Sequence, residues 1–364
     1  MDSIISDILI TICYWLPILN IMLLRSLNHN YNNIISSNDF GKIIIRLQNN
    51  NICKMEHLDH IPNLYFDINI TNETPLFYNK IIRLHLQDHS YDIDFVNRCS
   101  NLKYLWLANN NITDSHIKNL NNISELGIYR NEKITNNGIS HMEKLTSLNL
   151  SYNTKIDNLN STHTNITTLI LIRSVLSNES LCQFTNVTNL DIQYNTHIND
   201  FTLCKLTNIK KLCLAENAEI SDLSIQKLTN ITSLWLDNNT NITIDKLTDI
   251  TYLKIRKIHN INDLQLRNLT KINTLSLNNC NAITMKSIKF LTNITSLTIL
   301  NSKIDGTNLS LLTNIITFNT HRNPNIRHHH ITNMLQLKNL CCNDFITSDI
   351  QRMPNLKTIN YIEI

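Results

Sequence analysis

The residues with the most obvious potential for chemistry are three consecutive histidines, His328, His329 and His330. Imidazole nitrogens are common metal ligands, but neighbouring residues on an extended chain point to alternate faces, and no Cys or acidic residue lies at a metal-ligand spacing. The sequence also lacks a Gly-rich phosphate loop, a Gly-x-Ser-x-Gly turn and a His-Glu-x-x-His helix. We therefore interpret the histidines as a solvated loop and expect no metal, no cofactor and no catalytic residue.

The cysteines and the glycosylation sequons also have a structural interpretation. The nine cysteines are scattered, and Cys341 and Cys342 are adjacent, which is too close for an ordinary disulfide between them. We expect free thiols in a reducing compartment. The Asn-x-Thr/Ser sequons arise from a recurring Leu-Thr-Asn-Ile-Thr phrase, so we assign them to the fold rather than to glycosylation. These sequons include Asn111, Asn165, Asn186, Asn230 and Asn293.

One pattern recurs along most of the chain: apolar-x-x-Leu-x-Leu/Ile-x-x-Asn. A clean copy is Leu102, Leu105, Leu107 and Asn110. The steps between copies are mostly 21 or 22 residues, which indicates about fifteen turns of a solenoid. The middle apolar residues are Leu64, Leu84, Leu105, Leu126, Leu148, Leu169, Leu190, Leu212, Leu234, Leu253, Leu275, Leu297, Phe318, Leu340 and Ile359.

The spacing predicts the structure of each turn. Alternating leucines are the signature of a short strand with one buried face. The Asn that follows is expected to turn the chain and bond backbone groups at the bend, so that successive Asn residues form a ladder. A second apolar set, such as Ile112, Ile117 and Leu120, predicts an irregular or short helical segment on the outside. A single turn buries too few side chains to fold alone, so the turns must stack.

In this pattern the chain resembles leucine-rich-repeat proteins over residues 61–364. The resemblance implies an α/β solenoid with short parallel strands on its concave face. The segment Ile112-Thr113-Asp114 and the Leu-Thr-Asn-Ile-Thr strings resemble intracellular repeat classes. Four turns carry another residue in place of the ladder Asn, and we expect those turns to be looser or locally bent. The replacements are Ser174, Ile258, Cys280 and Ser302.

Residues 1–45 do not repeat, and residues 46–60 form a linker or an N-terminal cap. Apolar residues in the first segment fall at spacings typical of short amphipathic helices broken near Pro17. The segment resembles an F-box, although Ile5, Asn20 and Tyr31 depart from its usual Pro, Asp and Trp. The resemblance implies docking on a Skp-type adaptor subunit. The implied contact residues are Ile8, Leu9, Ile12, Leu16, Pro17, Ile21 and Leu24.

A signal peptide or membrane anchor is the competing interpretation of residues 8–24, which form a nearly uncharged apolar run. The preceding residues Asp2 and Asp7 are acidic rather than basic, and Pro17 and Asn20 interrupt the run. The run is also short for a spanning helix. These features argue against membrane insertion.

The concave strand face is the predicted partner-binding surface. The middle residue of each Leu-x-Leu, and the residues that flank the pair, point away from the core. Aromatic residues and Arg supply most of the energy at protein interfaces. The candidates are Tyr104, Trp106, Tyr129, Arg130, Tyr152, Arg173, Tyr194, Trp235, Tyr252 and Arg256, with Gly127, Lys254, Lys257 and Arg322 at equivalent positions.

These features favour a non-catalytic adaptor that recruits a target protein to a cullin-RING ubiquitin ligase. The net charge of +3, with basic residues interspersed among acidic ones, argues against a nucleic-acid partner. The Asn- and Ile-rich style resembles F-box and repeat proteins of giant DNA viruses, which implies the host cell cytoplasm. A secreted or anchored recognition protein and a structural spacer remain alternatives. Leu356, Ile359 and Tyr361 predict an apolar C-terminal edge open to another chain.

Overall fold

The computed structural model describes part of the chain, and this part divides into two compact units. Unit 1 comprises residues 1–170 and 174–176, and unit 2 comprises residues 171–173 and 177–364. Residues 1–44 lie outside the described residues, so the F-box-like segment and the alternative signal or anchor both stay predictions. The described residues are 45–47, 64–66, 78, 81–87, 94–108, 111–159, 162–331, 333–342, 353–360 and 362–363.

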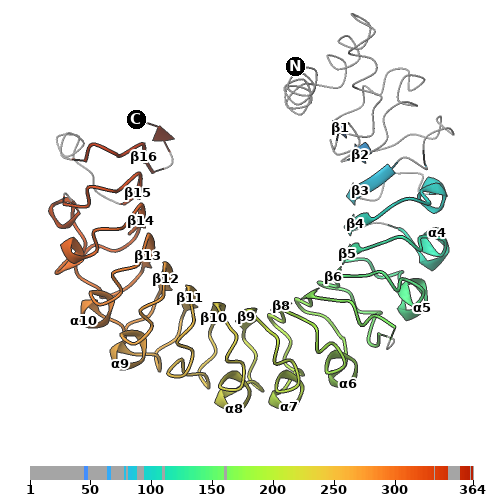
Figure 1. Ribbon diagram of the computed structural model, residues 1–364, viewed down its shortest axis with the longest axis horizontal. Coiled ribbons are helices and arrows are strands. Elements are labelled where there is room, and N and C mark those ends of the chain that lie inside the picture. Colours follow the sequence, from blue (N-terminus) through green and yellow to red (C-terminus); the bar gives the residue numbers. More distant parts are fainter. Residues whose placement is uncertain are drawn as a thin grey trace, which may run out of the picture. The chain divides into compact units, whose positions relative to one another are not determined.

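Unit 1 contains a parallel sheet in which the strands pair in chain order (Figure 1). The first strand lies ahead of the predicted start of the repeats at residue 61 and pairs with the second, so the sheet begins one strand earlier than the repeat pattern indicates. The strands are β1 (Ile45–Leu47), β2 (Leu64–Phe66), β3 (Ile81–Gln87), β4 (Tyr104–Ala108), β5 (Glu125–Tyr129), β6 (Ser147–Asn149) and β7 (Thr168–Ile170).

The strands of unit 2 also pair in parallel and in chain order, from β8 through β16. Its last strand, β17 (Ile362–Glu363), turns back and pairs antiparallel with β16. The edge at Ile359, predicted to be open, is therefore covered by the chain itself. The other strands are β8 (Asn189–Asp191), β9 (Lys211–Ala215), β10 (Ser233–Asp237), β11 (Tyr252–Arg256), β12 (Thr274–Asn278), β13 (Ser296–Leu300), β14 (Thr317–Asn319), β15 (Asn339–Cys341) and β16 (Thr358–Ile359).

The predicted repeat positions are confirmed, because each of the fifteen middle apolar residues lies in one of the strands β2 to β16. The register pairs them with one another, as in Leu105 with Leu126 and Leu126 with Leu148. From Leu84 to Leu340 all of these side chains are buried. Burial of one large apolar side chain contributes roughly 1.5–3 kcal/mol, so the stacked leucines are the main source of stability.

The Asn ladder is also confirmed, and Asn153 shows its geometry. This side chain is fully buried. Its Nδ2 donates to the Asn131 carbonyl of the preceding turn at 2.8 Å. Its Oδ1 accepts from the backbone N–H groups of Lys155 at 2.9 Å and Ile156 at 2.8 Å. One amide therefore pairs three backbone groups at a bend where the backbone cannot pair them.

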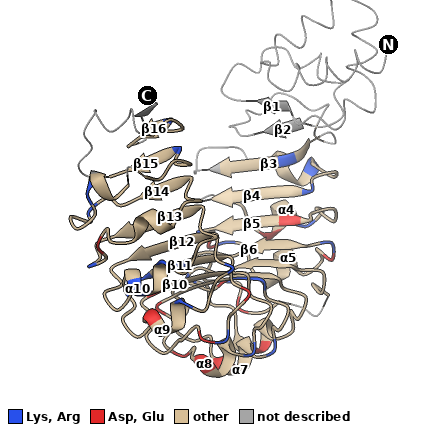
Figure 2. Ribbon diagram, turned by 60° about the vertical axis from the view of Figure 1, so that its left-hand side comes forward, with Lys and Arg blue, Asp and Glu red and all other residues tan. Residues whose placement is uncertain are grey.

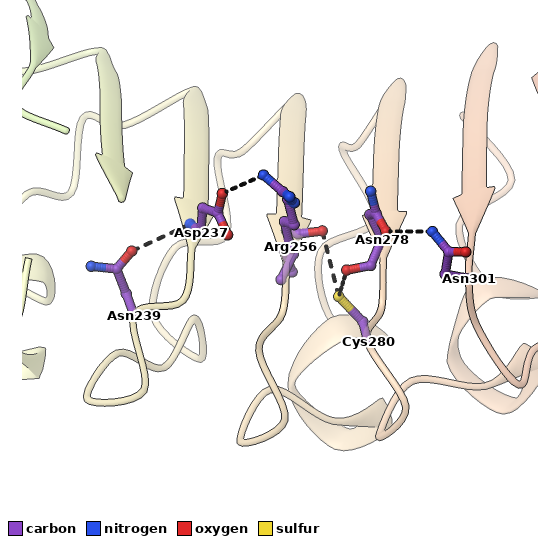
Figure 3. A network of polar contacts seen from close by, with 7 residues as sticks. Asp237, Asn239, Arg256, Asn278, Cys280 and Asn301 are labelled. Atoms are coloured by element: carbon purple, nitrogen blue, oxygen red, sulfur yellow. Dashed lines mark hydrogen bonds and ion pairs between the residues drawn. The ribbon is translucent and has the colours of Figure 1, made fainter. Parts of the chain in front are cut away.

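Turns without the Asn replace part of this bonding. The Ser174 hydroxyl accepts from the Leu176 N–H, and the Ser302 hydroxyl accepts from the Ile304 N–H. Cys280 donates its thiol to the Ile255 and Asn278 carbonyls, both at 3.4 Å (Figure 3). Ile258 bonds nothing through its side chain, but it is fully buried.

Short helices lie on the other side of each unit from the strands (Figure 1). They are η4 (Asp94–Arg98), α4 (Asp114–Ile117) and α5 (Asn136–Ile139) in unit 1. In unit 2 they are α6 (Asn178–Leu181), α7 (Asp200–Leu203), α8 (Asp222–Ile225), α9 (Asp263–Leu266), α10 (Met285–Ile288), η5 (Leu309–Leu311) and η6 (His328–His330).

A carboxylate at the start of several helices joins neighbouring turns. The Asp114 carboxylate accepts from the Thr135 N–H at 2.8 Å and from its hydroxyl at 2.7 Å. Asp263 repeats the arrangement with Thr284 and also accepts from the Ser287 hydroxyl. Burial by itself would raise the pKa of Asp263, but these hydrogen bonds and the Lys286 charge outweigh it and lower the pKa.

The described sequon asparagines and cysteines and the three histidines are parts of the repeats. The sequon residues Asn165, Asn230 and Asn293 each donate Nδ2 to a carbonyl of the preceding turn. All seven described cysteines have free thiols. The three histidines form the short helix η6 rather than an extended loop. Within the described ranges, no group of three His, Cys, Asp or Glu residues is placed to hold a metal ion, and no helix is long and apolar enough to cross a membrane.

Candidate partner-binding surface

Outward-facing residues of unit 1 form two rows across the strands, because parallel register aligns equivalent positions of successive turns. The rows lie on the two sides of the buried leucines Leu84, Leu105 and Leu126. The first row is Arg83, Tyr104, Glu125, Ser147 and Thr168. The second row is His85, Trp106, Gly127, Asn149 and Ile170.

Among the side chains of this surface that the structure describes, Trp106 has the most exposed large ring, with 38% of the residue accessible. Its ring lies directly against Gly127, where an added Cβ would collide with the indole. It also meets the His85 ring edge-on, with centroids 6.2 Å apart and planes at 89°. The missing side chain at position 127 therefore lets the indole lie along the strand face.

A hollow of about 310 Å³ opens beside these residues. On its rim the Arg83 guanidinium stacks on Tyr104, 3.7 Å from the ring centroid. Asn149 also lines the hollow and is 9% exposed. Its Oδ1 accepts from the Ser151 N–H at 2.9 Å, which fixes the orientation of the amide. The hollow thus combines aromatic walls with Arg83, Glu125 and an oriented amide.

The turn that follows the strands of unit 1 carries a second cluster. Arg130 and Tyr152 adopt left-handed backbone conformations, with φ of 51° and 59°. The Tyr129 and Tyr152 rings meet at 5.3 Å between centroids. The Arg130 guanidinium carbon lies 4.9 Å from the Tyr152 centroid and 5.2 Å from that of Tyr129.

Unit 2 has its own aromatic and basic contacts. Arg173 stacks on Tyr194 at 5.0 Å, again at two positions with positive φ. The Lys254 ammonium lies 3.7 Å from the centroid of Trp235, which is half-buried. Tyr252 is 39% exposed. In Figure 2 the strands are mostly uncharged, with isolated basic and acidic segments.

Two contacts in unit 2 limit what its strand face can do. Arg256 is held by an ion pair to Asp237, with 3.0 Å between Nη1 and Oδ2 (Figure 3), so this guanidinium is already engaged. Cys213 lies on β9, next to Asp191 of β8 on one side and Trp235 of β10 on the other. Burial and the Asp191 charge raise the pKa of Cys213 to about 12. Burial likewise raises the pKa of Asp191. Cys213 is therefore a poor nucleophile at neutral pH.

The structure separates the predicted surface residues into two kinds. Tyr104, Trp106, Tyr129, Trp235, Tyr252 and Arg256 lie on strands, whereas Arg130, Tyr152, Arg173 and Tyr194 lie in left-handed turns. Whether any of them binds a partner stays a prediction. The surface predicted from the sequence did not include four residues that line the hollow, Arg83, His85, Glu125 and Asn149. Arg83 and His85 flank Leu84 as Tyr104 and Trp106 flank Leu105, so alignment of the repeats could have found them.

Comparison with known proteins identifies the fold. An internalin from Listeria monocytogenes is similar with a TM-score of 0.56 and 22% identity, over 79% of this chain and 88% of its own. A leucine-rich-repeat protein of Leptospira interrogans has a TM-score of 0.50 and 18% identity, over 78% and 85%. TLR13 in complex with ssRNA13 has a TM-score of 0.52 and 16% identity, over 83% of this chain and 59% of its own.

This protein has the α/β leucine-rich-repeat fold. Neither the protein-family models nor the curated proteins match the chain. At these identities the similarity to the solved structures extends to the fold and not to function.

Proposed function

We propose that this is a non-catalytic recognition protein that holds a partner protein on the strand face of unit 1. The observation that carries the proposal is the exposed Trp106 ring, laid along the strands over Gly127 beside a hollow. A large ring left exposed beside a hollow is typical of a surface that a partner covers, and Trp, Tyr and Arg dominate the energetics of protein interfaces.

The mixed charge of this face favours protein over nucleic acid. Its first row carries Arg83 and Glu125, followed by the neutral Ser147 and Thr168. A nucleic-acid strand would need several cations along one path to neutralise its phosphates. One similar structure, TLR13, is a complex with ssRNA13, so single-stranded RNA is a competitor worth testing.

The surface is tested with Trp106→Ala against Leu264→Ala. Leu264 is 63% exposed in α9, so its removal also deletes a large exposed apolar group but away from the strand face. With partners captured from cell extract and identified by mass spectrometry, we expect Trp106→Ala to lose a specific partner by tenfold or more. Leu264→Ala should retain it. Equal capture by both variants and the wild type would contradict the proposal.

We further propose that the partner is a substrate for degradation and that the protein is a substrate-recruiting adaptor of a cullin-RING ligase. Support comes from the F-box-like spacing of Ile8, Leu9, Ile12, Leu16, Pro17, Ile21 and Leu24. In this role residues 1–45 bind a Skp-type adaptor, the repeats bind the target, and partner subunits transfer ubiquitin. The site of action would be the cytoplasm, of a host cell if the virus-like composition reflects the source.

Pull-down with a Skp-type adaptor tests this role. We expect the wild type to bind, and Leu16→Asp with Ile21→Asp to abolish binding while the circular dichroism of the repeats is unchanged. Failure of the wild type to bind would rule out the adaptor role. N-terminal sequencing of the expressed protein separates the alternative, because removal of about the first 25 residues would indicate a secreted recognition protein.

A further inference from the structure

The turn after each of the strands β5 to β14 places one residue in the left-handed region of backbone space. At three of these positions the residue is Asn, namely Asn238, Asn279 and Asn301, with φ of 56°, 57° and 48°. Asn tolerates this region better than other residues with a side chain. The fold can therefore build this turn with Asn at low cost.

Four successive turns instead alternate Arg and Tyr at this position: Arg130, Tyr152, Arg173 and Tyr194. Positive φ in bulky residues is strained, and such strain persists mainly where the side chain has another task. Glu216, Lys257 and Arg322 are further departures from Asn, but only these four alternate a cation with a ring. The alternation therefore needs an explanation beyond the turn.

The cluster in unit 1 shows what the side chains do together. The Tyr129 and Tyr152 rings meet nearly edge to face, and the Arg130 guanidinium lies within 5.2 Å of both ring centroids. A guanidinium held against rings loses little conformational freedom when it binds, and its N–H edge stays available. Arg130 is itself exposed. The cluster is therefore a prearranged donor fork at the surface.

Within the part of the chain that the structure describes, no ion pair involves Arg130. The ion pairs among these residues join Arg256 to Asp237 and Lys271 to Asp249, and His116 contacts Asp94 at 3.4 Å. Arg256 shows that a carboxylate is placed beside an arginine elsewhere on the strand face. At Arg130 the rings are present, but none of the described carboxylates pairs with the guanidinium. A carboxylate is the group that matches a guanidinium fork in a two-bond geometry.

We propose that Tyr129, Arg130 and Tyr152 form a carboxylate-recognition site, and that the partner presents an acidic segment with an Asp or Glu side chain to Arg130. This inference rests on the proposed function, because the segment belongs to the protein held on unit 1. The chemistry favours a peptide over nucleic acid, since the cluster contributes a single stacked cation, whereas a nucleic-acid strand needs several cations along its path. The Arg173–Tyr194 pair repeats half of the motif within unit 2.

A defined peptide tests the site directly on the full chain. The probe is a fluorescein-labelled peptide of twelve alternating Glu and Ser residues, and the control peptide has Gln in place of each Glu. By fluorescence anisotropy at low salt, we expect the Gln peptide to bind at least tenfold more weakly. Arg130→Gln should weaken binding of the Glu peptide about tenfold. Arg322→Gln, which changes an arginine in the same type of turn with φ of 62°, should leave it unchanged.

Three results would overturn the inference. They are equal affinity for the two peptides, unchanged affinity in Arg130→Gln, and tighter binding of a labelled oligouridylate than of the Glu peptide. A wild type that binds the Glu peptide but captures no partner from extract would sink the proposed function and leave this site standing. Partner capture that is lost in Trp106→Ala but intact in Arg130→Gln would contradict the carboxylate site and leave the proposed function standing.

Arg130→Asn separates recognition from folding, because it removes the guanidinium and supplies the residue that the turn favours. We expect this variant to melt at the same or a higher temperature than the wild type and to lose Glu-peptide binding. A lower melting temperature would show that Arg130 serves the fold, which would contradict the inference.

Discussion

The Asn ladder makes a quantitative prediction at Asn153. Replacement by Ala removes the donor to the Asn131 carbonyl and the acceptor for the Lys155 and Ile156 N–H groups. Each lost hydrogen bond costs about 1 kcal/mol, and a buried backbone group left unpaired costs up to roughly 3 kcal/mol. Because the site is fully buried, we expect Asn153→Ala to lower the free energy of unfolding by about 3–5 kcal/mol.

Asn153→Ser gives an intermediate point in the same series. Ser174 and Ser302 occupy this ladder position naturally, and each hydroxyl accepts one backbone N–H group. A serine at 153 should therefore keep one of the three bonds. We expect Asn153→Ser to lower the free energy of unfolding by about 2–3 kcal/mol, less than Asn153→Ala does.

Urea unfolding followed by circular dichroism measures both variants, and Asn314→Ala is the control. Asn314 is exposed and donates one bond to the Thr292 carbonyl, so water replaces it at little cost. In Asn153→Ala, the rate of amide hydrogen exchange should increase most, relative to the wild type, at Lys155 and Ile156. A loss below about 1 kcal/mol in Asn153→Ala, or one equal to that of Asn314→Ala, would refute the reasoning.

Three further predictions concern the strand face and the helical side. Gly127→Ala should displace the Trp106 indole, which shifts its fluorescence and weakens partner capture. It should also lower the free energy of unfolding by about 1–3 kcal/mol. An unchanged fluorescence spectrum would contradict the contact between Gly127 and Trp106. Asp263 has a lowered pKa, so its carboxylate stabilises the fold above pH 3.8, the ordinary pKa of Asp. This contribution is lost as the pH falls below 3.8 and through the lower pKa of the folded state. By urea titration, the free energy of unfolding of Asp263→Asn should therefore fall less than that of the wild type between pH 5 and pH 3. Cys213, with a pKa raised to about 12, should react slowly with iodoacetamide at pH 8 by peptide mapping. Asp191→Asn should speed that reaction, because the Asp191 charge contributes to the raised pKa.

The sequence alone determined the repeating parts of this protein. The fifteen apolar centres from Leu64 to Ile359 predicted the strands β2 to β16, because a half-buried strand requires alternation and a stack of turns requires a constant period. The ladder Asn residues were predictable for the same reason. A sharp buried bend leaves several backbone groups unpaired, and one side-chain amide at that position can both donate to a carbonyl and accept from the N–H groups.

The tertiary structure decided what the surface positions do. Register places His85, Trp106, Gly127 and Asn149 in one row, although about twenty residues separate each from the next along the chain. The Arg130 cluster depends on positive φ at two turns, which the residue types Arg and Tyr argue against. The repeat can be recognised from the residues of each turn, although the turns are stable only when they stack. The binding surface arises from hydrogen bonds between turns and from backbone conformations that the stacked core imposes.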